Sequence, residues 1–299
     1  MTGPHAAHGP SGDPARRGPG SRSARRPEAG GRAGRLLFQA WVALCTGLAL
    51  LPIYLLVVVS VAPGPALFGE RPALVITRPT FRFWLAVLGS GDLWHPLLKS
   101  LAVAAMTTAG TLALGTPGAY VIARLPPRAR YAVVLGLLVT RMFPEFAIGV
   151  SVATRFAQLG LTDSAVGLAL AHVTGVLPFV VWLLVGAFEA VPRDVEAAAA
   201  LDGASRLATL RRVVAPMVAP GLAVAALFAW LYSWNEFLYA RLLTTSANTL
   251  PLQVFQAIDR GTRQQMAAVA VVLVLPILAV VAVLQRRLRP GAMAGAIRG

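Results

Sequence analysis

Six long apolar runs constrain this chain more than any other feature of its sequence. A helix needs about 20 apolar residues to cross a bilayer, and each of these runs reaches that length. Overall, 57% of the residues are hydrophobic and 13% are charged, whereas an ordinary soluble domain is about 25% charged. The sequence therefore predicts an all-α integral membrane protein with six transmembrane helices. Their approximate limits are residues 36–61, 97–123, 131–154, 164–188, 218–243 and 266–285.

The first run has two features of a cleaved signal peptide. It follows a basic stretch and ends in Ser60-Val61-Ala62. The apolar core of a signal peptide, however, has about 7–15 residues, and this run is much longer. We therefore interpret the first run as a helix that is retained as a membrane anchor.

The positions of the basic residues predict the orientation of the helices. The formal net charge of +15 comes from 27 basic and 12 acidic residues, and Lys99 is the only lysine. Such a charge is also typical of nucleic-acid-binding proteins, but these arginines gather at the ends of apolar runs. Because basic residues accumulate on the cytoplasmic side of a membrane, we expect both termini in the cytoplasm. Most of the basic residues lie in the segments 1–35, 124–130, 189–217 and 286–299.

The same pattern divides the chain into four regions. Residues 1–35 are rich in Gly, Pro, Ser and Arg, and we expect a disordered, basic cytoplasmic tail. Residues 36–92 hold the first transmembrane helix and an external loop. Residues 93–285 form the transmembrane core, which includes a cytoplasmic loop at 191–217. Residues 286–299 form a second cytoplasmic tail.

The loop 191–217 has the signals of two short helices joined by a turn. Pro192 suits a first helical position, and the following alanines favour a helix. Asp202-Gly203 ends this helix, because glycine accepts the left-handed conformation of a C-terminal cap. Ser205 can cap the second helix, and we expect Pro216 to end it.

One face of this loop is made of small apolar residues. The short cytoplasmic loops of this chain cannot build a core over that face, so it is expected to remain exposed. Such a face is typical of a contact with another protein, but an interfacial helix lying on lipid has a similar pattern. Composition leaves both interpretations open. The stripe consists of Ala197, Ala200, Leu201 and Ala204.

The loop also resembles a known motif. Glu196-Ala197-Ala198, Asp202-Gly203-Ala204 and Pro216 closely resemble the EAA loop of permease subunits of binding-protein-dependent ABC importers. That family commonly has two consecutive glutamates here, whereas Ala197 occupies the second position in this chain. Further motifs extend the resemblance over roughly residues 93–299 and are similar to the carbohydrate branch, which includes MalG-like subunits. These motifs are His95–Ser100, Gly118–Arg124, Met142–Pro144, Leu159–Leu161, Leu177–Phe179, Ser233–Phe237, Thr249–Pro251 and Ala294–Gly299.

This resemblance implies a fold, a function and a set of partners. The fold would be that of type I importer permeases (MetI-like), and the function would be carbohydrate transport across the bacterial inner membrane. The partners would be a second permease subunit, two ATPase subunits and an extracytoplasmic solute-binding protein. The loop would couple this chain to an ATPase. The residues that the resemblance assigns to coupling are Glu196, Ala197, Ala198, Ala200, Leu201, Asp202, Gly203, Ala204, Leu207 and Pro216.

The sequence contains no pattern that would make this chain an enzyme. A P-loop needs a Gly-Lys pair, but the only lysine, Lys99, follows Leu98. Cys45 is the sole cysteine, which excludes an internal disulfide. The four histidines lack the spacing of a metal site. We therefore predict no catalytic residue, metal or cofactor, and we assign ATP hydrolysis to a separate subunit.

Two groups of polar residues within the apolar runs are candidates for a substrate pathway. Arg141 and Glu145 are four residues apart, so they can pair on one helix face, and Pro144 between them permits a kink. A charged residue inside a membrane faces a partner or an aqueous path, so structural pairing and pathway lining both remain open. In the fifth run, Trp234, Asn235 and Glu236 suit a sugar pathway. Trp234 also suits an ordinary aromatic belt at the membrane interface.

Three other functions remain to be compared with a carbohydrate permease. A permease of the same family for a non-sugar solute would have the same sequence features. An ion-gradient carrier could use Arg141 and Glu145 as its coupling site, but such carriers are usually longer and contain paired repeats. A membrane-embedded enzyme would need a catalytic constellation, and we find none.

Overall fold

The computed structural model describes residues 32–64, 75, 78–246 and 248–287, and every regular element within these ranges is a helix. The chain divides into two units, Met1–Leu51 and Pro52–Gly299. Helix α1 (Arg32–Val61) runs across their boundary and begins before residue 36, the start predicted from the sequence. The rest of the predicted N-terminal tail, and most of the C-terminal tail, lie outside the described residues.

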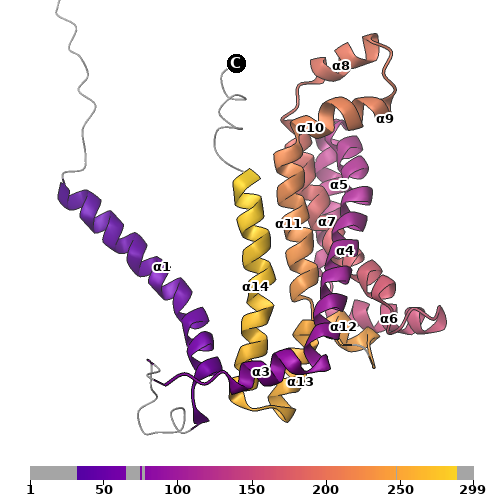
Figure 1. Cartoon of the computed structure of the whole chain (residues 1–299). Helices are drawn as coiled ribbons and strands as arrows, with labels where there is room; N and C mark the ends of the chain where they lie inside the picture. Colours follow the sequence, from indigo (N-terminus) through magenta and orange to yellow (C-terminus); the bar gives the residue numbers. More distant parts are fainter. Residues whose placement is uncertain (1–31, 65–74, 76–77, 247, 288–299) are drawn as a thin grey trace, which may run out of the picture. The chain divides into compact units, whose positions relative to one another are not determined.

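Four described helices are long and apolar enough to cross a membrane, and two bent pairs raise the number to as many as six. The fold is thus the six-span, all-helical class that the sequence predicts, with two of its spans broken. In the second unit the helices form a bundle, with α8 and α9 at one end and α3, α12 and α13 at the other (Figure 1). The four long helices are α1, α4 (Gly91–Ala123), α7 (Ala165–Glu189) and α14 (Arg263–Arg287).

The predicted span 131–154 is not a continuous helix. α5 (Pro127–Val139) continues into a single 3₁₀ turn, η1 (Thr140–Met142), and α6 (Glu145–Gln158) then leaves at 85°. The break falls at Phe143, whose backbone is extended, and at Pro144, whose backbone is also not helical. Proline disfavours a helical conformation in the residue before it and lacks an N–H of its own. The kink expected at Pro144 is therefore confirmed, but it is a full break.

The predicted span 218–243 also ends early. α11 (Ala219–Asn235) stops at Glu236, which has an extended backbone, and a separate short helix, α12 (Leu238–Leu243), follows. At the other end of α11, the preceding segment Arg206–Met217 meets it at 85°. Both ends of α11 thus lie at breaks in the helical run, and both breaks carry residues that the sequence singled out.

The remaining helices lie at the end of the bundle opposite α8 and α9 (Figure 1). α3 (Arg82–Gly89) precedes α4, which begins at Gly91 rather than near residue 97. α13 (Leu250–Arg260) connects α12 to α14, and the sequence did not predict it. Ser100 on α4 accepts a hydrogen bond from the backbone N–H of Leu250 (2.8 Å), which fixes α13 against the bundle.

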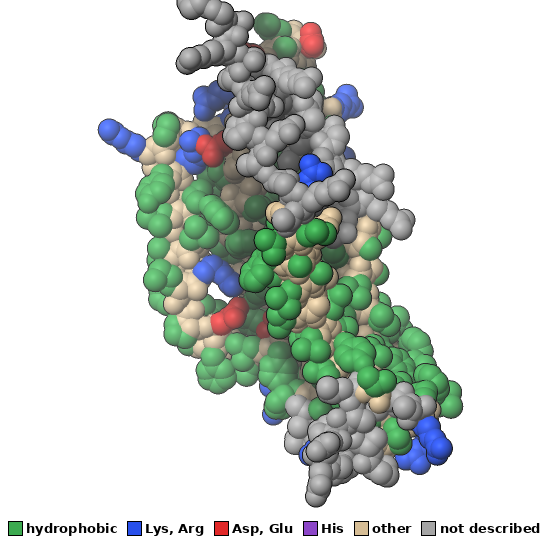
Figure 2. All heavy atoms as spheres, turned by 90° about the vertical axis from the view of Figure 1, so that its left-hand side faces the viewer, with side chains coloured by type: hydrophobic (Ala, Val, Ile, Leu, Met, Phe, Trp, Pro, Cys, Tyr) green, Lys and Arg blue, Asp and Glu red, His purple; other side chains and the backbone are tan. Residues whose placement is uncertain are grey.

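The centre of the bundle is α7, which packs against α4, α5 and α11. Leu184, Phe188 and Val180 on α7 are completely buried, together with Ala225 and Ala229 on α11. Small residues at helix crossings allow close packing in membrane bundles. By contrast, many large apolar side chains on the outer faces are exposed, and hydrophobic side chains predominate on the face drawn in Figure 2. These outer faces suit lipid or another subunit.

Candidate functional site

The loop predicted to couple to an ATPase is a compact helical element at one end of the bundle. We call it the coupling element. Its turn contains Gly203 with a φ of +82°, and Ser205 accepts a hydrogen bond from the N–H of Ala208 (3.3 Å), so both predicted caps are confirmed. The element consists of α8 (Arg193–Leu201), α9 (Arg206–Thr209), the π-helical turn η2 (Leu210–Val214) and α10 (Ala215–Met217).

Two proline predictions in this element need correction. Pro192 is the N-cap of α8 rather than its first helical residue. Pro216 does not end the second helix, because it lies within the first turn of α10. A proline in a first turn has no N–H that needs a partner. The chain instead turns at Val218, after α10 and before α11.

The two faces of the coupling element differ sharply. The inner face packs on the bundle through the buried residues Ala199, Thr209, Leu210 and Val214. The outer face is apolar and exposed, with Leu201 at 89% and Leu207 at 62% exposure. Among the predicted coupling residues Ala204 is half-buried and Glu196 points inward. The exposed ones are Ala197, Ala198, Ala200, Leu201, Asp202, Gly203, Leu207 and Pro216.

Glu196 binds residues of its own chain at the end of α4. One carboxylate oxygen accepts a hydrogen bond from Arg124 Nε (2.8 Å) and pairs with Arg124 Nη2, and the other accepts from the Tyr120 hydroxyl (2.8 Å). Its side chain is only 17% exposed. Sequence reasoning did not find these partners, because Tyr120 and Arg124 are far from Glu196 in the chain.

A second site is a cavity of about 660 Å³ between α7, α11 and the break before α6. We call it the polar cavity. It brings together four of the five residues predicted for a substrate pathway, which are Arg141, Glu145, Asn235 and Glu236. Its other walls include Phe179, Phe228 and Tyr232. A cavity lined mainly by apolar and aromatic groups, with a few convergent polar ones, is typical of a ligand site.

Arg141 and Glu145 do pair, but across the break rather than along one helix. The distance between Arg141 Nη1 and Glu145 Oε1 is 3.4 Å. The same Nη1 donates to the carbonyl oxygen of Gly175 (2.6 Å), and the Tyr232 hydroxyl donates to Glu145 Oε1 (2.8 Å). The Arg141 guanidinium lies 5.5 Å from the centre of the Tyr232 ring. Tyr232 is therefore a functional candidate that the sequence prediction missed.

Helical spacing explains which residues of α11 reach the polar cavity. Phe228, Leu231, Tyr232 and Asn235 follow the i, i+3, i+4, i+7 pattern of one helix face, and all four line the cavity. This pattern could have identified Tyr232 from the sequence. Trp234 lies on a different face of α11 and does not line the polar cavity.

The expectation that Trp234 lines the pathway is corrected by the structure. Its side chain is completely buried, stacks on Trp230 at 4.9 Å and donates to the carbonyl oxygen of Leu273 on α14 (3.2 Å). Consecutive residues on a helix point about 100° apart. Trp234 and Asn235 therefore face different surroundings, and Trp234 contributes to the packing of α11 on α14.

Glu236 lies at the edge of the polar cavity, but its carboxylate is turned into the protein. It accepts hydrogen bonds from the backbone N–H groups of Tyr239 (2.8 Å) and Ala240 (3.2 Å), at the start of α12. Its Oε2 also lies 2.9 Å from Nε2 of His172, a residue that is 1% exposed. Nδ1 of His172 is 2.8 Å from the Ser233 hydroxyl. Glu236 therefore fixes the corner between α11 and α12.

The close approach of α11 to α7 at Gly175 gives a direct test of the polar cavity. A methyl group in place of the Gly175 hydrogen would lie 2.9 Å from Cζ of Tyr232. We expect Gly175→Ala to displace Tyr232 and to destabilise the bundle by about 1–3 kcal/mol, measured as a lower melting temperature of the purified protein. Gly186→Ala, on the same helix with nothing within 4 Å, is the matched control and should be neutral or stabilising. Equal stability of the two variants would contradict this packing.

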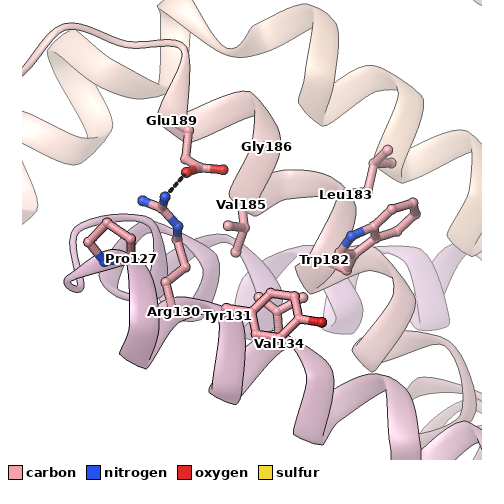
Figure 3. A pocket seen from close by; sticks show the side chains of 9 residues that line it. All are labelled: Pro127, Arg130, Tyr131, Val134, Trp182, Leu183, Val185, Gly186 and Glu189. Atoms are coloured by element: carbon pink, nitrogen blue, oxygen red, sulfur yellow. Dashed lines mark ion pairs between the residues drawn. The ribbon is translucent and has the colours of Figure 1, made fainter.

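A second cavity, of about 510 Å³, lies between α5 and α7 near the coupling element (Figure 3). Arg130 and Glu189 form an ion pair at one side of it (2.6 Å), and Tyr131 and Trp182 line another part. This pair joins the start of α5 to the end of α7. Within the described ranges, no cluster of His, Cys, Asp and Glu has the arrangement of a metal site.

Comparison with known proteins identifies the family. Residues 115–293 match the family described as "Binding-protein-dependent transport system inner membrane component". Because the match covers more than half of the chain, the chain belongs to this family. This confirms the resemblance inferred from the EAA loop and places the chain among multi-pass proteins of the inner membrane.

The alignments with individual relatives extend over nearly the whole length of those relatives. The protein ORF1 of Streptomyces antibioticus is 40% identical over 77% of this chain and 99% of its own. The trehalose transport system permease protein SugB of Mycobacterium tuberculosis is 32% identical over 86% of this chain and 95% of its own. Among solved structures, a bacterial ABC transporter involved in import of the acidic polysaccharide alginate matches with a TM-score of 0.71. It is 22% identical and covers 86% of this chain and 97% of its own, which supports the fold.

Proposed function

We propose that this chain is a permease subunit of an ABC importer that moves a carbohydrate across the inner membrane. The observation that carries the proposal is the exposed apolar face of the coupling element in a chain of this family. A stripe of apolar side chains in water is typical of a protein contact, and α8 and α9 carry it at one end of the bundle. The contact we assign to it is an ATPase subunit.

The choice of a carbohydrate rests on two observations. Relatives of this chain carry the names of trehalose and diacetylchitobiose transport systems. The polar cavity also has the composition of a sugar site, because Phe179 and Phe228 offer aromatic faces while Arg141 and Asn235 offer hydrogen-bond donors. We therefore place the polar cavity on the substrate pathway, with Glu145 and Tyr232 as its other polar groups.

The proposed assembly contains this chain, a second permease subunit, two ATPase subunits and an extracytoplasmic binding protein. In this assembly ATP is hydrolysed by the ATPase subunits, and both termini of this chain lie in the cytoplasm. A ligand drives a conformational switch only through its different affinities for the two states. ATP bound to the partner therefore acts on this chain through the coupling element.

Uptake into proteoliposomes tests the proposal. The transporter would be reconstituted with its ATPase and binding protein, and uptake of labelled trehalose, maltose and diacetylchitobiose would be followed with and without ATP. We expect ATP-dependent uptake of at least one sugar, which stops when the ATPase or the binding protein is left out. Uptake driven by an ion gradient alone would instead indicate a secondary carrier. ATP-dependent uptake of amino acids or metal ions only would contradict the carbohydrate assignment.

A further inference from the structure

The inward-facing side of the coupling element is attached to the bundle by a cluster of polar contacts. Tyr120 lies in the last turn of α4 and Arg124 caps that helix. Between them and α8 lies a cavity of about 660 Å³, which Ala200, Ala204 and Leu207 also line. Direct packing on this side is therefore incomplete, and the polar contacts of Glu196 bridge the gap.

Arg124 joins three elements at once. Its Nε and Nη2 hold Glu196 on α8, while Nη1 donates to the carbonyl oxygen of Phe188 (3.1 Å) and Nη2 to that of Val191 (3.5 Å), at the end of α7. The Phe188 carbonyl also accepts from the backbone N–H of Val191 (3.2 Å). Carbonyls at the end of a helix carry its negative dipole end, which attracts a guanidinium. In return, Arg193 Nη2 on α8 donates to the carbonyl oxygen of Arg124 (3.4 Å).

Tyr120 completes this arrangement and makes it rigid. Its hydroxyl binds the second oxygen of Glu196, and its ring lies 5.6 Å from the Arg124 guanidinium and edge-on to Phe188 at 5.7 Å. Both carboxylate oxygens of Glu196 thus have partners within the chain, and the charged hydrogen bonds are of the strong class. The Arg124 and Glu196 side chains are each less than one-fifth exposed.

We propose that Tyr120, Arg124 and Glu196 form a clamp that transmits movement of α8 to the ends of α4 and α7. The clamp rests on the proposed function, because it needs an ATPase to move α8. Glu196 is then a positioning residue within this chain, and the ATPase contact belongs to the exposed face around Ala197 and Leu201. The charge of Glu196 acts by fixing the coupling element to the two most tightly packed helices of the bundle.

The test measures how strongly the binding protein stimulates ATP hydrolysis, a quantity that a purely structural role of the clamp would not change. The binding protein outside the membrane can influence ATP hydrolysis inside only through the permease subunits, since such coupling is a free energy between two sites. We would measure ATP hydrolysis by the complete transporter in nanodiscs, with and without its binding protein. Co-purification with the ATPase would be measured on the same preparations.

The variants form a double-mutant cycle of Arg124→Gln and Glu196→Gln. We expect each to keep the ATPase bound but to lower the stimulation of hydrolysis several-fold. The double variant should be no worse than the single ones, because residues that act as a pair are not additive. Tyr120→Phe, which removes one hydrogen bond and keeps the ring, should give a smaller loss. Glu189→Gln is the control, since the Arg130–Glu189 pair lies at the same end of the bundle but joins α5 to α7.

The possible results separate the clamp from the proposed function. If Glu196→Gln loses the ATPase, or if the two losses multiply in the double variant, Glu196 contacts the partner and the clamp is wrong. Full stimulation in all three single variants would also overturn it. If the unaltered chain does not bind an ATPase at all, the proposed function itself fails.

Discussion

Ala200→Glu is expected to separate this chain from its ATPase while leaving the chain folded in the membrane. Ala200 is exposed on α8 and lines the cavity between α8 and the end of α4, so a longer side chain has room within the chain. In the complex, however, the new carboxylate would be buried without a partner, which costs several kcal/mol. We expect at least a tenfold loss of affinity, since about 1.4 kcal/mol corresponds to tenfold. Co-purification of the ATPase with the tagged permease measures it.

The matched control is Ala129→Glu. Ala129 is also exposed, in the first turn of α5 near the same end of the bundle, but it lies outside the coupling element. It adds the same charge to the same side of the membrane and should keep the ATPase bound. Normal ATPase binding by Ala200→Glu, or an equal loss in both variants, would show that the apolar face of α8 is not the docking surface.

Gly203→Pro tests the shape of the same surface. The φ of Gly203 is +82°, whereas proline is held near −65°. The turn between α8 and α9 cannot keep its form, so the two halves of the apolar face should no longer align. We expect loss of ATPase co-purification with normal membrane insertion. Retained co-purification and transport would mean that docking does not depend on this turn.

The local structure of the coupling element could be read from its sequence because its signals are local. The Gly203 turn and the Ser205 cap depend on residues a few positions away, and both are present. The attachment of Glu196 to Arg124 depends instead on where the end of α4 lies, which a loop sequence does not contain. The family resemblance assigned Glu196 to coupling without naming a partner within the chain, and the structure places its side chain against the bundle.

The breaks in the spans were harder to predict than the spans themselves. Apolar length identifies a span, but it does not say where a helix stops within the apolar run. Pro144 gave a signal for one break. The corner at Glu236 has no proline or glycine, and it depends on a buried histidine on another helix. Apolar length likewise did not show which of the predicted pathway residues line the polar cavity. Asn235 and Arg141 reach the polar cavity, while Trp234, next to Asn235, does not.

Glu236→Ala is expected to have the largest effect on stability among these changes. The carboxylate accepts two N–H groups at the start of α12 and lies 2.9 Å from His172 Nε2. Truncating it leaves these N–H groups and the His172 nitrogen without their partner in a buried place, and each buried polar group left unsatisfied costs about 1–3 kcal/mol. The melting temperature of the purified protein in detergent should fall by roughly 10 °C.

Glu236→Gln distinguishes this structural role from a role in binding substrate. The amide keeps an oxygen that can accept from Tyr239 and Ala240, so most of the stability should return, because capping these N–H groups needs an acceptor rather than a charge. Transport by Glu236→Gln should then stay close to normal. The opposite pattern would be normal stability of Glu236→Ala with a raised KM for sugar in both variants. Such a result would make Glu236 a substrate ligand, because a residue that caps α12 from inside the protein cannot be removed without cost, whereas a pathway ligand can.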